Sequence, residues 1–154
     1  MRVFADLAEL SEAVDVDLEP GQWRVVTQSM IDEFAGATGD VQWIHVDPGR
    51  AKDGPYGTTI AHGFLTLSLL SVLLRDVYRV ETTRMGVNYG LDKVRFPAPV
   101  RVDSRVRVRA SLASFAWIAD DGAQISWNAV VEVEGSDKPA CVARTISRIF
   151  ESRG

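Results

Sequence analysis

The sequence is poor in the residues that build disulfides and zinc sites. Its 154 residues include a single cysteine, Cys141, and two histidines, His45 and His62. One cysteine excludes an internal disulfide framework, and two histidines without paired cysteines are a weak basis for a zinc site. The composition, with 46% hydrophobic and 25% charged residues, is typical of a globular chain. We therefore predict a single domain over residues 1–154 with its own hydrophobic core.

Motifs for several large functional classes are also missing. The chain has no glycine-rich phosphate or dinucleotide motif, no serine nucleophile elbow and no HExxH zinc motif. Its most apolar stretch, residues 60–74, is interrupted by a histidine, a threonine and two serines, and is too short and too polar to span a bilayer. The first residues lack the apolar segment of a secretory signal. We therefore expect a cytoplasmic protein with no membrane partner.

The charge distribution is uneven. The formal net charge is −4, which argues against a dedicated nucleic-acid partner. Residues 93–109 nevertheless hold six basic residues and one acidic residue. This run is either the solvated face of a sheet or an anion site for a small phosphorylated ligand.

Two short elements are expected near the N-terminus. Apolar residues at helical spacing predict an amphipathic helix over residues 2–14; they are Val3, Leu7, Leu10 and Val14. A proline and a glycine end this section, and residues 23–26 form a short run typical of a strand.

Capping residues define the next helices. Thr27 or Ser29 is a suitable N-cap for a helix that Gly39 would end. A long connection follows, and Asp47 with Pro48 predicts one further helical turn. Long connections within compact domains are often functional.

The second half of the chain predicts a buried helix followed by a sheet. Residues 60–80 are apolar on all sides, which indicates a helix of about five turns in the core. Alternation of apolar and polar residues then predicts four strands, near residues 85–96, 102–112, 123–133 and 140–150. The fold class is therefore α+β, with an antiparallel sheet wrapped around one central helix. Such a sheet has edge strands, and a dimer would cover one of them.

One loop segment carries residues suited to acid–base chemistry. Asp40 follows Gly39, and His45 lies five positions further on. On an ideal helix this spacing would place the two side chains on different faces, whereas irregular backbone could bring them together. A carboxylate and an imidazole could then hold one water molecule. The alternative is that Asp40 stabilises the turn and His45 packs in the core.

Three segments resemble the MaoC-like (R)-specific enoyl-CoA hydratases, which have the hotdog fold. They are residues 34–45 with the Gly-Asp and the histidine, residues 60–64 with a His-Gly pair, and residues 93–100 with two prolines. The resemblance extends from about Thr27 to the C-terminus. It departs from the family at Gln42 and Trp43, which stand where the family has Asn-Pro.

The resemblance implies hydration of trans-2-enoyl-CoA to (3R)-3-hydroxyacyl-CoA. Asp40 and His45 would hold the attacking water, and the N–H of Gly63 would bond the thioester oxygen. Gln42, Lys93 and Arg95 would contact the substrate, with the two basic side chains on coenzyme A phosphates. His62 is expected to bond loop backbone rather than take part in catalysis. The family also implies a homodimer, and hydration needs no metal or redox cofactor because it changes no oxidation state.

Two other functions remain open at this point. A hotdog acyl-CoA thioesterase would share the fold and the ligand, although the aspartate and histidine pair favours the hydratase. A non-catalytic acyl-CoA-binding protein is the second alternative, because Gln42 and Trp43 replace family residues close to the pair.

Overall fold

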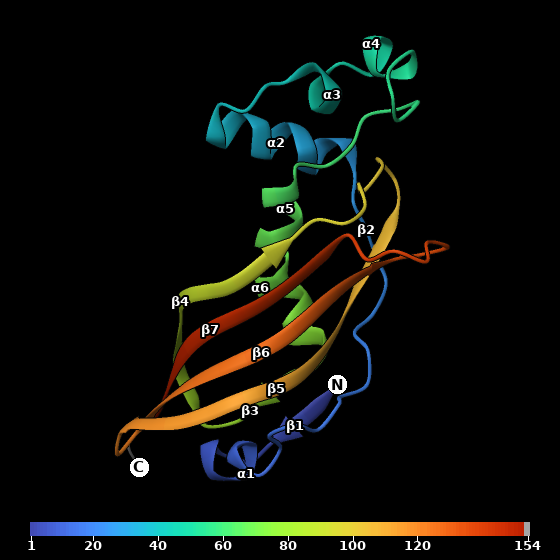
Figure 1. Ribbon diagram of the computed structural model, residues 1–154. Coiled ribbons are helices and arrows are strands. Elements are labelled where there is room, and N and C mark those ends of the chain that lie inside the picture. Colours follow the sequence, from blue (N-terminus) through green and yellow to red (C-terminus); the bar gives the residue numbers. More distant parts are fainter. Residues whose placement is uncertain (153–154) are drawn as a thin grey trace.

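The structure, a computed structural model, describes residues 1–152 and is organised around a strongly curved antiparallel sheet (Figure 1). The sheet has the strand order β2-β5-β6-β7-β4. Its strands are β2 (Arg24–Val25), β4 (Thr83–Arg95), β5 (Arg105–Ala119), β6 (Gly122–Val133) and β7 (Cys141–Glu151). The last four confirm the strands predicted from alternation, and all of their pairings are antiparallel. The predicted α+β fold class is confirmed.

A helical run crosses the concave side of this sheet (Figure 1). It consists of α5 (Gly63–Ser68), α6 (Leu70–Leu73) and the 3₁₀ turn η1 (Leu74–Asp76). Leu69 keeps right-handed helical angles, φ −64° and ψ −19°, so the run is continuous. It is shorter than the predicted residues 60–80 because strand β3 (Tyr78–Val80) follows immediately.

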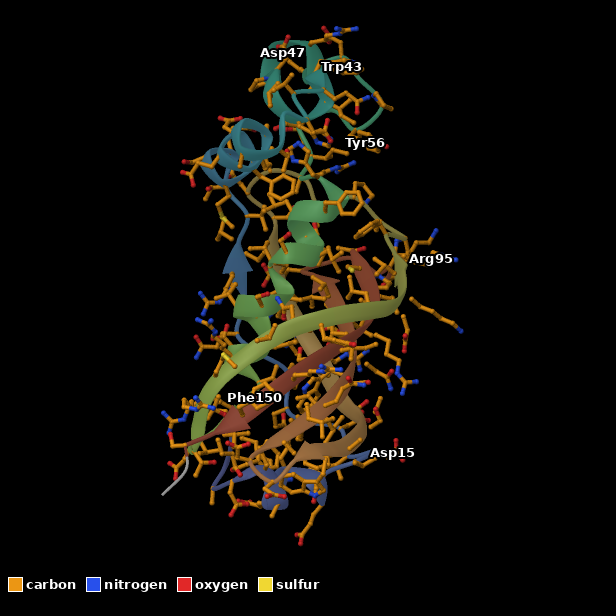
Figure 2. All side chains as sticks on the ribbon, turned by 90° about the vertical axis from the view of Figure 1, so that its left-hand side faces the viewer. Asp15, Trp43, Asp47, Tyr56, Arg95 and Phe150 are labelled. Carbon is orange, nitrogen blue, oxygen red and sulfur yellow. The ribbon has the colours of Figure 1, made fainter. Side chains whose placement is uncertain are left out.

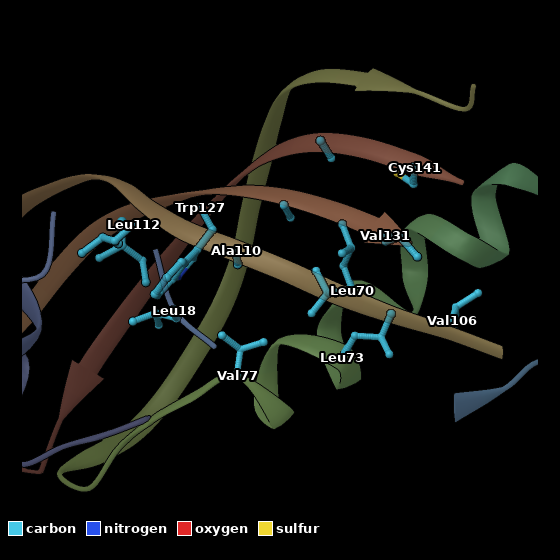
Figure 3. Close-up of a cluster of buried hydrophobic side chains, with 14 of the residues drawn as sticks. Leu18, Leu70, Leu73, Val77, Val106, Ala110, Leu112, Trp127, Val131 and Cys141 are labelled. Carbon is cyan, nitrogen blue, oxygen red and sulfur yellow. The ribbon is translucent and has the colours of Figure 1, made fainter. Parts of the chain in front are cut away.

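The core lies between this central helix and the sheet (Figure 3). Leu70 and Leu73 are buried against apolar side chains of β5 and β6. The alternation in β5 is as predicted, since four side chains of one face are at most 5% exposed: Val106, Val108, Ala110 and Leu112. Burial of such side chains is the main stabilising contribution of the fold.

The other face of β5 carries a row of ion pairs. Arg105 pairs with Glu134 at 2.9 Å, and Arg107 and Arg109 both pair with Glu132, at 2.8 and 2.6 Å. Ion pairs that remain partly accessible to solvent contribute little to stability. This half of the basic run is therefore a solvated sheet face.

Three helices gather at one end of the molecule (Figure 1). They are α2 (Gln28–Thr38), α3 (Trp43–Val46) and α4 (Pro48–Lys52). The predicted caps are confirmed: the Thr27 side chain accepts from the N–H of Met30, and Gly39 ends α2 with φ +79°. Asp47 caps α4 by accepting from the N–H of Arg50 at 2.9 Å. These caps fix where the loop at residues 39–42 begins and ends.

The predicted helix over residues 2–14 is wrong. Arg2–Phe4 forms strand β1, which pairs in parallel with β3, and helix α1 covers only Leu7–Ser11. Phe4 is fully buried whereas Val3 is 38% exposed. The helical spacing of the apolar residues was overridden by pairing with a strand more than 70 residues away, which burial of Phe4 favours.

The two edges of the sheet differ. Residues 14–25 run along β5 and bond its main chain, with Leu18 N–H donating to Ala110 at 3.2 Å and Gly21 N–H donating to Val108 at 2.9 Å. Strand β4 forms the opposite edge and pairs only with β7 within residues 1–152. In that same part of the chain, no helix is long and apolar enough to cross a membrane.

Candidate active site

The loop between α2 and α3 meets the start of the central helix. Asp40 lies in this loop, His45 lies in α3, and His62 is the N-cap residue of α5. One side-chain oxygen or nitrogen from each of the three residues lies within 4.8 Å of the others. The irregular backbone thus brings Asp40 and His45 together, and it adds a second histidine.

The hydrogen bonds of His45 define its tautomer. Its Nδ1 lies 2.7 Å from the main-chain oxygen of Ile60. Since a carbonyl oxygen only accepts, Nδ1 carries the hydrogen, and in the neutral ring Nε2 keeps a free lone pair. Nε2 is therefore the nitrogen able to take a proton from a bound molecule.

A second layer of contacts holds the backbone of His45. The Gln28 side chain donates from Nε2 to the main-chain oxygen of His45 at 2.8 Å. The Thr59 hydroxyl in turn donates to Oε1 of Gln28 at 2.5 Å. The histidine is 6% exposed, and both its ring and its main chain are anchored.

Burial lowers the pKa of His45 below its ordinary value of 6.5. The hydrogen bond to Ile60 and the charge of Asp40 oppose this effect, while His62 adds to it. The ring is thus unprotonated at neutral pH, which is the form that can act as a base.

The same three residues are a candidate metal-ligand group, but their geometry is unfavourable. The rings of His45 and His62 stack with centroids 3.8 Å apart and planes inclined by 25°. The lone pairs of imidazole nitrogens lie in the ring planes, so two nearly parallel rings cannot direct them at one ion. The observed arrangement fits ring stacking better than a shared ligand site.

Gly63 is the first residue of α5, and the first N–H groups of a helix have no partner within the helix. A side chain at this position would meet the ring of Phe96, because a Cβ would lie 2.9 Å from its Cδ2 atom. Phe64 packs edge-on against the same ring, at a centroid distance of 6.1 Å. The main chain at Gly63 is therefore bordered by two aromatic side chains, both of them solvent-exposed.

Comparison with known proteins identifies the family. The family model described as "MaoC like domain" matches residues 9–133. This chain belongs to the MaoC-like family. The 3-hydroxyacyl-thioester dehydratase Z of Mycobacterium tuberculosis is 51% identical over 148 residues, which cover 96% of this chain and 98% of the relative. The predicted family and the predicted hydro-lyase class are confirmed.

Solved structures support the fold of this MaoC-like protein. A protein of Archaeoglobus fulgius described as a monoamine oxidase regulatory protein has a TM-score of 0.75 and 21% identity, covering 99% of this chain and 98% of that one. An (R)-hydratase from A. caviae has a TM-score of 0.62 and 22% identity, covering 84% and 96%. These likenesses establish the hotdog fold.

The two departures from the family motif lie at the start of α3. Gln42 is the N-cap residue of α3, where its main-chain oxygen accepts from the N–H of His45 at 2.9 Å. The ring of Trp43 packs on Gly54 and lies under the Arg50 guanidinium, 4.5 Å from the ring centroid. Figure 2 places Trp43 beside Asp47, at the far end of the molecule. The tryptophan thus contributes to packing between α3 and the segment after α4.

The two basic candidates of the MaoC-like protein lie on β4. Lys93 lines a hollow together with Asp92, Asn128 and Arg144. Arg95 extends outward from the end of the strand (Figure 2) and donates to the main-chain oxygen of Val94 at 2.7 Å. Phe96, which borders Gly63, directly follows Arg95.

The sequence did not predict every contact within the site. The expected bond from His62 to loop backbone is present, since its Nε2 lies 2.9 Å from the main-chain oxygen of Asp40. Its stacking on His45 was not expected. The roles of Gln28 and Thr59 were not predicted either. The bond from Gln28 to His45 spans 17 residues and the bond from Thr59 to Gln28 spans 31, so neither bond produces a local sequence pattern.

Proposed function

We propose that this protein reversibly adds water to trans-2-enoyl-CoA thioesters and forms (3R)-3-hydroxyacyl-CoA. The observation that carries this proposal is the bond between His45 and Ile60, which leaves Nε2 of the imidazole free in a site shared with the Asp40 carboxylate. The 51% identical relative named as a 3-hydroxyacyl-thioester dehydratase supports the same reaction class.

In the proposed reaction, water adds across the double bond, with its hydroxyl group on the β-carbon and a hydrogen on the α-carbon. Asp40 accepts a hydrogen bond from the water, and Nε2 of His45 takes its proton while the oxygen bonds to the β-carbon. The electron pair of the double bond moves toward the thioester, which becomes an enolate. Transfer of the proton to the α-carbon then completes the product. The reverse sequence eliminates water.

The developing enolate needs a donor, and we assign this role to the N–H of Gly63. This group lies at the N-terminal end of the central helix, where the helix dipole also favours negative charge. Gly63 directly follows His62, whose ring stacks on that of His45. The absence of a side chain allows a thioester to approach the backbone closely.

The acyl chain would lie in a groove that follows the same helix. The groove has a volume of about 340 Å³ and is bordered by α5, α6, β4 and β7. Leu67, Leu70 and Leu74 line its helical side, and Tyr89 and Leu91 line its strand side. From Gly63 to Leu74 the helix rises by about 16 Å. The groove thus offers an apolar path away from the site.

Two further elements complete the proposal. Lys93 and Arg95 would contact the phosphates of coenzyme A, since both are exposed on the strand that leads to Phe96, the residue that borders Gly63. Two copies of the chain would pair through the open edge of β4, where large apolar side chains are 45–56% exposed: Met85, Val87, Tyr89 and Leu91. Pairing would satisfy the free main-chain groups of this edge and remove apolar area from water.

The deciding experiment is hydration of crotonyl-CoA, followed as the loss of enoyl absorbance. Coupling to dehydrogenases specific for each enantiomer of 3-hydroxybutyryl-CoA assigns the stereochemistry. We expect the (3R) product. Release of free thiol, detected with a thiol reagent, would instead identify a thioesterase. Calorimetric binding of crotonyl-CoA without turnover would identify an acyl-CoA-binding protein and overturn the proposal.

A further inference from the structure

His62 is buried at the centre of the site, but the reaction described above assigns it no role. Its side chain is 2% exposed. One face of its ring stacks on His45, and Phe34 lies against the ring at a centroid distance of 5.0 Å. His62 also directly precedes Gly63. One side chain is therefore in contact with, or adjacent in sequence to, all three proposed catalytic residues.

The hydrogen bond from His62 reaches the main chain of Asp40 rather than its carboxylate. Nε2 lies 2.9 Å from the main-chain oxygen of Asp40. Because that oxygen only accepts, Nε2 carries the hydrogen. The N–H of Asp40 makes a longer contact, 3.4 Å, with the Thr38 hydroxyl. The bond from His62 is thus the shorter of these two contacts, and it ties this exposed loop residue to the central helix.

The other nitrogen of the ring does not contribute to this link. Among the residues that the structure describes, Nδ1 of His62 is buried without a hydrogen-bond partner. A buried polar atom left unpaired is costly, so an apolar ring of similar size would pack at lower cost. The feature that a plain aromatic ring could not supply is the donor at Nε2.

We propose that His62 is a positioning residue that holds the Asp40 backbone with its Nε2–H and the His45 imidazole with its ring face. The two contacts act together, since one rigid ring sets the distance between the loop and α3. The inference rests on the proposed hydration activity, because positioning is defined here with respect to that pair.

Two substitutions separate the two contacts. His62→Phe keeps a stacking ring and removes the donor, whereas His62→Gln keeps a donor at the same reach and removes the ring. We expect His62→Phe to lower kcat for crotonyl-CoA by about 10²-fold, the usual cost of a misplaced catalytic group, with KM changed much less. We expect His62→Gln to recover at least part of this loss.

A matched control addresses stability. Thr66 is buried one helical turn after His62, and its hydroxyl donates to the main-chain oxygen of His62 at 3.4 Å. Thr66→Val removes this contact, leaves the ring of His62 in place and is expected to keep the wild-type kcat. If His62→Phe is folded and retains the wild-type kcat, or if Thr66→Val loses kcat as strongly as His62→Phe, the positioning role is wrong.

A second readout does not depend on turnover. The chain has only two histidines, so nitrogen NMR spectra of their rings are assignable from one substitution. We expect opposite tautomers, with hydrogen on Nδ1 of His45 and on Nε2 of His62. The carboxylate and amide signals of Asp40 should move in His62→Phe and stay in place in Thr66→Val. Hydrogen on Nδ1 of His62, or Asp40 signals that do not move in His62→Phe, would overturn the positioning role. This test works even if the wild-type protein hydrates no thioester. Absence of hydration by itself would refute only the proposed function.

Discussion

The ring of Phe96 occupies the space that a side chain at Gly63 would need, since a Cβ there would lie 2.9 Å from the Phe96 Cδ2 atom. The segment of residues 93–100 and the start of the central helix are thus in contact at the backbone group that we assign to the thioester oxygen. The contact makes the main chain at Gly63 sensitive to any added atom.

Gly63→Ala tests this sensitivity. Because Phe96 is 41% exposed, its ring can turn away and the protein should still fold. The new methyl group and the displaced ring would crowd the N–H, and we expect hydration to slow by about 10²- to 10³-fold, as for loss of an oxyanion-hole donor.

The matched control for this change is Gly36→Ala. Gly36 lies within α2, and a Cβ at this position would meet nothing within 4 Å. This substitution should leave activity unchanged and stabilise the protein slightly, because alanine favours helix by about 1 kcal/mol over glycine. A wild-type rate for Gly63→Ala would remove Gly63 from the proposed mechanism.

The acid–base pair is tested by Asp40→Asn and His45→Gln. Each change keeps size and some hydrogen bonding while removing a group that holds or moves a proton. We expect each to lower kcat for crotonyl-CoA hydration by about 10²–10⁴-fold. The double variant should be little slower than the slower single variant, because two groups that hold one water act as a unit. A near wild-type rate for Asp40→Asn would contradict the mechanism.

The pKa of His45 predicts how acid affects both activity and stability. Burial keeps this pKa below 6.5 in the folded protein, so the unfolded chain binds the proton first as the pH falls. The free energy of unfolding should therefore be unaffected by His45 above pH 6.5 and should decrease below it. Hydration should decline in the same acidic range as the free base is lost. Denaturant titrations of wild type and His45→Gln check the first point, and the variant should lack this contribution.

Lys93 and Arg95 are tested together. Replacing both with alanine should raise KM for crotonyl-CoA while leaving kcat nearly unchanged, if they bind the phosphates of coenzyme A. The effect should shrink at high salt, which screens exposed charges. Arg109→Ala serves as the control, because its side chain is on the solvated face of β5. An equal rise in KM for a pantetheine thioester, which lacks the nucleotide phosphates, would show that the two residues act elsewhere.

The open edge of β4 predicts a dimer in solution. Light scattering at micromolar concentration should give twice the chain mass of 16.9 kDa. Val87→Lys should shift the protein toward monomer, because a charge on this strand opposes edge pairing. Val25→Lys is a matched control, since Val25 and Val87 are both 45% exposed and Val25 lies near the opposite edge. A monomeric wild type would contradict the dimer.

Local signals in the sequence predicted most of the elements. Thr27, Gly39 and Asp47 cap helices through contacts with near neighbours, and alternation in β5 reflects burial on one face only. The N-terminal helix failed because Arg2–Phe4 pairs with Tyr78–Val80, a contact that no nearby residue encodes.

The site was predictable to a similar extent. Asp40 and His45 lie five residues apart in a segment that resembles the family motif, so they could be selected as candidates before the structure was known. The stacking of His62 on His45 could not be selected, because it depends on how the central helix approaches α3. Contacts between distant segments of the chain are set by packing of the whole domain, and a single sequence does not record them.

The segment of residues 14–25 that runs along β5 has a consequence for assembly. A sheet with two free margins could add copies of itself without limit and grow into a fibre. Within residues 1–152, the N-terminal segment bonds one margin, at Ala110 and Val108, and the proposed pairing of copies would use the other margin, β4. Association through a single margin is complete after one step, because a two-fold arrangement uses the same surface on both copies. If the proposed dimer forms, its growth would thus be limited by a stretch of the same chain with almost no regular secondary structure.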